Sequence, residues 1–347
     1  MIVYTRNERF FKVGLPVYSP RVREKRPVAP AFLLFFLSPI VAELLTSSSP
    51  PVLFFTPFGL TVMTALYGSG AILARELAIR WKKGWPTLVA LGAAYGMVEE
   101  GLMVKSFFDP NWPGIGALGR YGRLAGVNWV WSVELTIFHA LFSIVIPNIL
   151  VNLVFPKARD RRVTGEIGFA IFCAVLAAAV ALGGLAITKF APPPIPYVLT
   201  ALCVAGLVVL ARVLPKALLP GSFVGPDNAA AAPLQFLLLG LGGTVLFFVL
   251  SWVVPGLPVP PIVTVLLVLD LVCGVFVGVW QMTRRYSFCA LNQWGIASGA
   301  LAFFILLAPL VQLDRNRTNV QGMAFVGLAM AVFLALVLVL VGRRRTP

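Results

Sequence analysis

The sequence predicts an all-α polytopic membrane protein, a bundle of about ten transmembrane helices with the N-terminus and the C-terminus in the cytoplasm. Hydrophobic residues make up 59% of the 347 and charged residues only 12%, about half the charged fraction of soluble proteins. The apolar residues form runs that are mostly 18 residues or longer, the length a helix needs to cross a bilayer. These runs lack strict alternation, which favours helices over a β-barrel.

Ten candidate spans follow from the apolar runs and from the proline and glycine clusters between them. They cover about 30–47, 52–79, 85–107, 128–155, 165–190, 197–214, 233–254, 262–283, 289–310 and 322–342.

The basic residues predict the orientation of these spans. A cytoplasmic N-terminus places 21 Lys and Arg residues on the cytoplasmic side and six on the opposite side. Such an excess is the normal sign of cytoplasmic loops. We therefore expect a multi-pass protein of the cell membrane. The net charge of +15 lies in short clusters between apolar runs, which favours the lipid bilayer over nucleic acid as its partner.

Two helix groups are expected along the chain. A basic cytoplasmic tail at 1–29 precedes a first group at 30–214, which holds helices 1–6 and most of the polar residues. A cytoplasmic linker at 215–232 leads to a second group at 233–347 with helices 7–10.

Ionisable residues inside the spans are the functional candidates, because such groups are costly in hydrocarbon and normally face protein or water. They are Glu43, Glu76, Glu99, Glu100, Glu134, His139 and Asp270. All but Asp270 belong to the first four spans, which predicts a site there. Glu76 follows Arg75 near the cytoplasmic end of its span and is expected to pair locally.

The other candidates form one layer in the outer half of the membrane. From helical rise, Glu100 lies about 10 Å below the outer end of its span and His139 about 16 Å below. Glu99 and Glu100 are adjacent, so on an α-helix their side chains point about 100° apart and are not expected to face one partner.

Three further polar residues lie in or beside the spans. Lys105 is close to the interface, where a lysine can reach the headgroups. Asn148 and Asn152, at i, i+4 spacing, are expected to bond across to another helix.

A paired-glutamate segment carries a family resemblance. Residues 95–108 read Tyr-Gly-Met-Val-Glu-Glu-Gly-Leu-Met-Val-Lys-Ser-Phe-Phe, and Phe138-His139 follows one helix later. Over about residues 60–155 this resembles the CPBP/Rce1-type (CAAX protease-like) intramembrane protease superfamily, which hydrolyses peptides with an activated water. The family spacing has its basic residue two or three positions after the pair, whereas Lys105 follows after four. A second polar position of the family pattern, four residues after a histidine, would fall on Ser143.

The resemblance implies catalytic roles for Glu99, Glu100, Glu134 and His139. Glu100 would be the general base, and His139 and Glu134 would help to hold a water or a divalent metal ion and to stabilise the oxyanion. A single histidine with carboxylates could ligate a divalent ion, although the spacing matches no standard metal motif.

Three functions stay open at this point. The chain could be an intramembrane peptidase, with a membrane protein or peptide as substrate. It could be a secondary transporter whose membrane-embedded acids couple to protons or bind a cationic solute. It could also be a non-catalytic membrane scaffold, for which incomplete motifs are typical.

Overall fold

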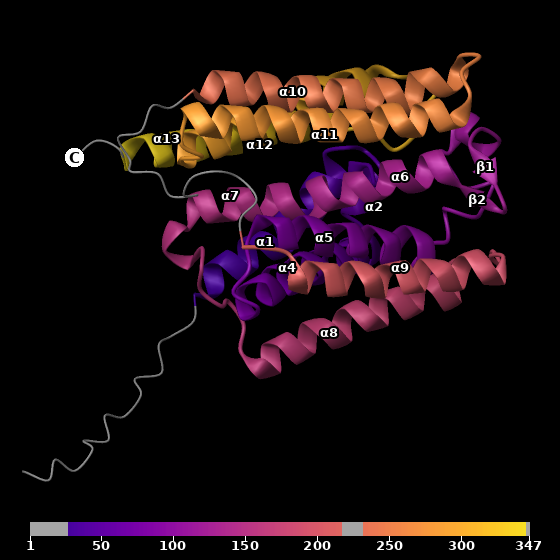
Figure 1. Ribbon diagram of the computed structural model, residues 1–347, viewed down its shortest axis with the longest axis horizontal. Helices are drawn as coiled ribbons and strands as arrows, with labels where there is room; N and C mark the ends of the chain where they lie inside the picture. Colours follow the sequence, from indigo (N-terminus) through magenta and orange to yellow (C-terminus); the bar gives the residue numbers. More distant parts are fainter. Residues whose placement is uncertain (1–26, 217–231, 345–347) are drawn as a thin grey trace, which may run out of the picture.

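A computed structural model describes residues 27–216 and 232–344, and these form a helical bundle with one two-stranded hairpin (Figure 1). Eight of its helices are long and apolar enough to cross a membrane, and a shorter apolar helix covers Val28–Leu44. The prediction of an all-α polytopic membrane protein is confirmed. Most of the predicted basic tail and of the predicted linker at 215–232 lies outside the described residues.

Many of the helices contain a π-helical turn, labelled η like the short 3-10 helices. The first group of elements is α1 (Val28–Pro39), η1 (Ile40–Leu44), α2 (Pro51–Phe54), α3 (Pro57–Met63), η2 (Thr64–Gly68), α4 (Ser69–Arg80), α5 (Trp85–Gly96), η3 (Met97–Met103), η4 (Gly116–Gly119), β1 (Arg123–Leu124), β2 (Val127–Asn128), α6 (Trp129–Phe138), η5 (His139–Val145), α7 (Ile146–Val154), η6 (Pro156–Ala158), α8 (Glu166–Ala181), η7 (Leu182–Ile187) and α9 (Pro194–Val213). The second group is α10 (Pro233–Phe248), η8 (Val249–Val253), η9 (Val254–Gly256), α11 (Pro261–Arg285), α12 (Ala290–Leu313) and α13 (Met323–Arg343). The strands β1 and β2 pair antiparallel between α5–η3 and α6.

The predicted spans coincide with these helices, with two clear differences at their ends. The second span begins at Pro57 and not at 52, because Thr56 caps it by accepting a hydrogen bond from the backbone N–H of Gly59. The third helix ends at Met103 and not at 107. Lys105 has a φ of +62°, a left-handed conformation that an α-helix cannot continue through.

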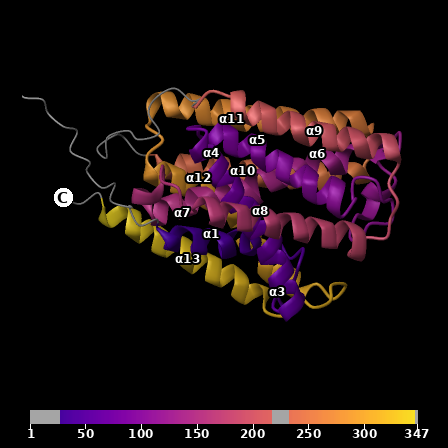
Figure 2. The same ribbon diagram turned by 90° about the horizontal axis from the view of Figure 1, so that it is seen from below.

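The helices are arranged in layers around the first group's central helices. Figure 1 shows α10–α13 together on one side of α1 and α4–α7, with α8 and α9 on the other side. Figure 2, turned by 90°, shows α13 beside α7. The start of α1 and the end of α13 lie at the same end of the bundle, where both line one cavity. The predicted cytoplasmic placement of both termini stays a prediction.

Glycines allow α10 and α12 to lie backbone against backbone. A Cβ atom added to Gly299 would lie 2.0 Å from the carbonyl oxygen of Leu237, and one added to Gly240 would lie 2.3 Å from that of Ile296. Real carbon atoms do not approach an oxygen so closely, so a side chain here forces the helices apart. Close approach at small residues is a normal basis of helix association in membranes.

We expect Gly299→Ala to lower the free energy of unfolding by roughly 1–3 kcal/mol, the usual cost of overpacking. The midpoint of thermal unfolding in detergent measures the effect. Gly274→Ala in α11 is the matched control, because its added Cβ would meet no atom within 4 Å. Equal midpoints for the two variants would show that α10 and α12 do not pack this closely.

Candidate functional site

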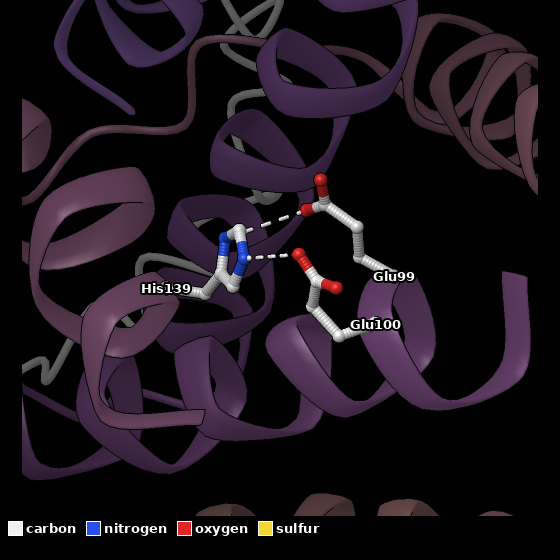
Figure 3. Close-up of side chains that lie close together, drawn as sticks. All are labelled: Glu99, Glu100 and His139. Atoms are coloured by element: carbon white, nitrogen blue, oxygen red, sulfur yellow. Dashed lines mark hydrogen bonds and ion pairs between the residues drawn. The ribbon is translucent and has the colours of Figure 1, made fainter. Parts of the chain in front are cut away.

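The centre of the site is formed by Glu99, Glu100 and His139, which converge from two helices (Figure 3). The Nε2 atom of His139 lies 3.2 Å from Oε1 of Glu100, and its Nδ1 atom lies 3.4 Å from Oε2 of Glu99. The side chains of His139 and Glu99 are 2% and 5% exposed, and that of Glu100 is 13% exposed. Glu100 is therefore the most exposed side chain of this group.

Two further helices contribute to this centre, because Tyr67 in η2 contacts both Glu43 in η1 and Glu99. The hydroxyl of Tyr67 lies within hydrogen-bonding distance of both Oε1 of Glu43, at 2.5 Å, and Oε1 of Glu99. A hydroxyl has one hydrogen, and ionised carboxylates only accept. Both contacts can be hydrogen bonds only when one of the two carboxyl groups carries a proton. Tyr67 therefore joins Glu43 and Glu99 in one buried chain of polar groups.

Second contacts orient His139 and Glu100. Because Glu100 accepts at Oε1 when ionised, Nε2 of His139 carries the hydrogen of that contact. Nδ1 lies 2.9 Å from the hydroxyl of Ser143. The other oxygen of Glu100 accepts from the hydroxyl of Ser106 at 2.5 Å, and Ser106 in turn accepts from the indole of Trp131 at 3.0 Å. Ser143 thus contacts the ring nitrogen of His139 that faces away from Glu100, and Ser106 contacts the carboxylate oxygen of Glu100 that faces away from His139.

Each of the four segments at the site is a π-helical turn. Glu43 lies in η1, Tyr67 in η2, Glu99 and Glu100 in η3, and His139 in η5. A π turn closes i→i+5 hydrogen bonds and is rare, and it occurs often at functional sites. The hydroxyl of Ser38 also ties two of these turns together, because it contacts the carbonyl oxygens of Tyr67 and Ser143 at 3.2 and 2.7 Å.

Glu99 and Glu100 contact one partner, whereas side chains about 100° apart on an α-helix were expected not to. His139 offers nitrogen atoms on two sides of its ring. Both glutamates therefore face the same partner, one at each nitrogen.

Glu134, the remaining residue implied by the family resemblance, lies apart from this centre. It is buried in α6, and its Oε1 accepts a hydrogen bond of 3.0 Å from the indole N–H of Trp252 in η8. Its other oxygen has no hydrogen-bond partner within residues 27–216 and 232–344. Glu134 links the first helix group to the second and makes no hydrogen bond to His139 in the described part of the chain.

The other polar candidates also lie outside the site. Lys105 donates to the carbonyl of Gly184 at 2.7 Å, which joins the end of η3 to η7. Asn148 donates within its own helix to Ile144 at 2.8 Å, so the expected bond to another helix is made only by Asn152, which accepts from Arg75. Asp270 is exposed on α11.

Glu76 pairs locally, as predicted, but with more partners than expected. Its Oε1 atom accepts the backbone N–H groups of Val163 and Thr164 at 2.6 and 3.0 Å. Its Oε2 atom lies 3.4 Å from Arg80 and 3.6 Å from Arg162. Glu76 thus fixes the loop before α8 to α4 and has a structural role.

The centre could hold a divalent metal ion. One ligand atom from each of Glu99, Glu100 and His139 lies within 4.8 Å of the others. Zinc takes nitrogen and oxygen ligands at about 2.0–2.2 Å, with three protein ligands in its catalytic sites. Ligand atoms on one such ion are separated by less than about 4.4 Å, so the donor set fits after a small inward movement of these side chains.

The sequence model of one protein family matches residues 32–250, more than half of the chain. That family is described as an uncharacterized membrane protein family. The chain belongs to this family. The match begins in α1 and ends in η8, so the family region contains Glu43, Tyr67, Glu99, Glu100 and His139.

A relative of the chain occurs in Archaeoglobus fulgidus, where it is named only as an uncharacterized protein. The two sequences are 28% identical over 127 residues, which is 36% of this chain and 38% of the relative. The chain thus matches well under half of the length of this curated relative. No solved structure matches the chain.

Several residues that contact the site were not predicted from the sequence. Tyr67 carries no charge, and a tyrosine in an apolar span gives no signal of its own. Ser106 and Trp131 belong to a loop and to an aromatic cluster, for which headgroup contact is the ordinary explanation. Ser143 stands where the family pattern has Asn or Asp, a departure from that pattern, and it contacts His139.

Proposed function

We propose that this protein is a membrane-embedded hydrolase of the CPBP/Rce1 type that cleaves peptide bonds within or beside the bilayer of the cell. One observation carries the proposal. Two carboxylates from one helix and an imidazole from another meet in a buried layer, and one of the carboxylates is partly exposed. A base, a hydrogen-bond donor and a restricted supply of water are the requirements of hydrolysis inside a membrane.

Glu100 is the general base in this proposal. It accepts a proton from a water molecule, and the water oxygen forms a bond to the carbonyl carbon of the peptide. His139, whose two ring nitrogens contact Glu100 and Ser143, stabilises the oxyanion by a hydrogen bond and transfers no proton of its own. The C–N bond then breaks, and the proton taken from water ends on the new amino group.

Glu99 is a positioning residue. It contacts Nδ1 of His139 and the hydroxyl of Tyr67, so it holds the imidazole in its orientation and does not need to meet the substrate. A divalent ion bound by Glu99, Glu100 and His139 would supply Lewis-acid activation of the same water. The residue roles of His139 and Glu100 would then become those of ligands.

A proton-coupled carrier is the second candidate, and the Glu43–Tyr67–Glu99 chain favours it. These three groups are in contact through the hydroxyl of Tyr67, and the contacts continue through His139 to Glu100. Chains of buried acids and histidine are typical of proton relays in transporters. The scaffold alternative gains no specific support from this geometry.

The test uses the full-length protein reconstituted in liposomes with quenched-fluorescence peptides that each contain one transmembrane segment. The hydrolase is expected to release fluorescence and to place oxygen from labelled water in the new carboxyl terminus. Metal content is measured by plasma mass spectrometry for the wild type, Glu100→Ala and His139→Ala. Stoichiometric metal that is lost in both variants would support the metal-assisted version, and cleavage without metal would support the Glu–His version.

Absence of cleavage by well-folded protein across the peptide panel would contradict the hydrolase proposal. A pH-sensitive dye inside the same liposomes then tests the carrier. Proton movement that depends on Glu43 and Tyr67 would support it.

A further inference from the structure

Asp270 is an exposed carboxylic acid in the middle of a membrane-spanning helix. It lies in α11, three residues from the midpoint of Pro261–Arg285, or about 4.5 Å along the helix axis. The hydrocarbon core extends about 15 Å to either side of its centre. With α11 centred in the bilayer, this short side chain therefore does not reach the headgroups. Of the acids more than one turn inside the described spans, Asp270 alone is exposed.

An exposed apolar face surrounds Asp270. Residues at i±3, i±4 and i±7 share one side of an α-helix, and every such neighbour of Asp270 is exposed. They are Val263, Leu266, Leu267, Cys273, Gly274 and Val277. The opposite side of α11, with Thr264, Val268 and Val279, is buried against the bundle. In Figure 1 the two described ranges end toward the left, whereas α11 begins on the right. Asp270 therefore points away from the bundle, toward the acyl chains.

This carboxyl group needs a polar partner. Within residues 27–216 and 232–344 it forms no hydrogen bond and no ion pair. An ionised carboxylate is costly in hydrocarbon, and acids inside spans normally pair with protein groups. A protonated carboxyl group still has an O–H and a C=O whose hydrogen bonds must be satisfied there. The partner is therefore expected on another molecule in the membrane.

We propose that the exposed face of α11 is the interface between two copies of this chain, with their Asp270 carboxyl groups hydrogen-bonded to each other. Copies inserted in the same direction pair symmetrically about an axis along the membrane normal. Each residue then lies at the same depth as its equivalent in the other copy. A protonated carboxyl group offers one donor and one acceptor, so Asp270 is complementary to a second Asp270.

The distribution of basic residues favours this symmetric pair over an ion pair between copies. In the part of the chain that the structure describes, no Lys or Arg is exposed more than one turn inside a membrane span. A second copy therefore offers Asp270 no cation at this depth. The proposal does not depend on the hydrolase, because α11 contributes no residue to the Glu–His site.

The native cysteines provide the first test, on the full-length protein in phosphatidylcholine vesicles. Cys173, Cys203 and Cys273 are exposed on α8, α9 and α11, and Cys289 is buried. A short bis-maleimide is expected to link two chains through Cys273, which lies one turn from Asp270. Cys273→Ala should remove this product, and the matched controls Cys173→Ala and Cys203→Ala should keep it. Equal loss in all three variants, or loss only in a control, would place the contact elsewhere and overturn the proposal.

The second test measures dimerisation by single-molecule photobleaching at increasing dilution in lipid. Asp270→Leu is expected to weaken the dimer roughly 3- to 30-fold, the range of one interhelical hydrogen-bonded contact in membranes. Asp270→Asn should remain within a few-fold of the wild type, because two amides can also exchange hydrogen bonds. An unchanged melting temperature of the monomer in detergent shows that both variants fold.

Two results of the second test would overturn the proposal. Equal dimerisation of the wild type and Asp270→Leu would mean that the carboxyl group does not stabilise the interface. A wild type that is monomeric at every dilution would exclude the second copy, and a basic helix of a different membrane protein would then be the partner of Asp270.

Discussion

Glu100→Gln is expected to reduce the rate of peptide hydrolysis by roughly 10²- to 10⁴-fold, the range by which a positioned general base accelerates a reaction. Glutamine has nearly the shape of glutamate: its amide oxygen can accept from Nε2 of His139, and its amide N–H can donate to the hydroxyl oxygen of Ser106, the two contacts of this side chain. It cannot take a proton from water. The variant should therefore keep its fold and its melting temperature while losing the chemical step.

Glu134→Gln is the matched control for that prediction. Glu134 is a buried glutamate of the same helical hairpin, but its contact is with Trp252 and not with His139. Its replacement should leave the hydrolysis rate within a few-fold of wild type if Glu100 acts alone as base. Comparable losses in the two variants would mean that the whole acidic layer, and not the Glu100–His139 contact, supports activity.

Glu76→Ala is expected to lower the free energy of unfolding by roughly 3–5 kcal/mol, the usual cost of removing one partner of a buried ion pair. The side chain is fully buried and accepts two backbone hydrogen bonds, from Val163 and Thr164. Its removal also leaves Arg80 and Arg162 without their buried carboxylate. Chemical denaturation of the protein in mixed micelles measures the loss.

The control for Glu76 uses the same two arginines. Glu166 pairs with Arg80 at 2.7 Å and with Arg162 at 2.5 Å, but its side chain is 70% exposed. Exposed ion pairs contribute little to stability because water screens them. Glu166→Ala should therefore change the unfolding midpoint much less than Glu76→Ala. A reversal of this order would mean that the loop before α8 is not held by the buried contact.

The membrane-spanning helices could be predicted because a single physical requirement dominates them. Apolar length and the distribution of basic residues depend on local sequence, so runs such as 323–343 are visible without any tertiary information. Their ends depend on finer events. The cap at Thr56 and the left-handed conformation of Lys105 place two helix ends several residues away from their predicted positions. Hydrophobicity does not predict such local backbone geometry.

The sequence predicted which ionisable residues form the site, but it did not predict how their side chains contact one another. Glu99, Glu100 and His139 were candidates because ionisable groups are rare in hydrocarbon. The expectation that adjacent glutamates cannot share a partner overlooked that one imidazole offers a nitrogen atom to each of them. The role of Tyr67 needed the structure, because its two carboxyl partners come from other helices that lie far away in sequence.

The π-helical turns also predict where one-residue gaps should fall when the sequences of this family are aligned. Each turn accommodates one residue more than an α-helical turn would, so a relative that lacks one residue at η3 or η5 could keep the same membrane crossings. Its glutamates and histidine would nevertheless be rotated by about 100° with respect to the rest of their helices. A single-residue gap at these positions would therefore distinguish relatives that conserve the whole site from relatives that conserve only the scaffold.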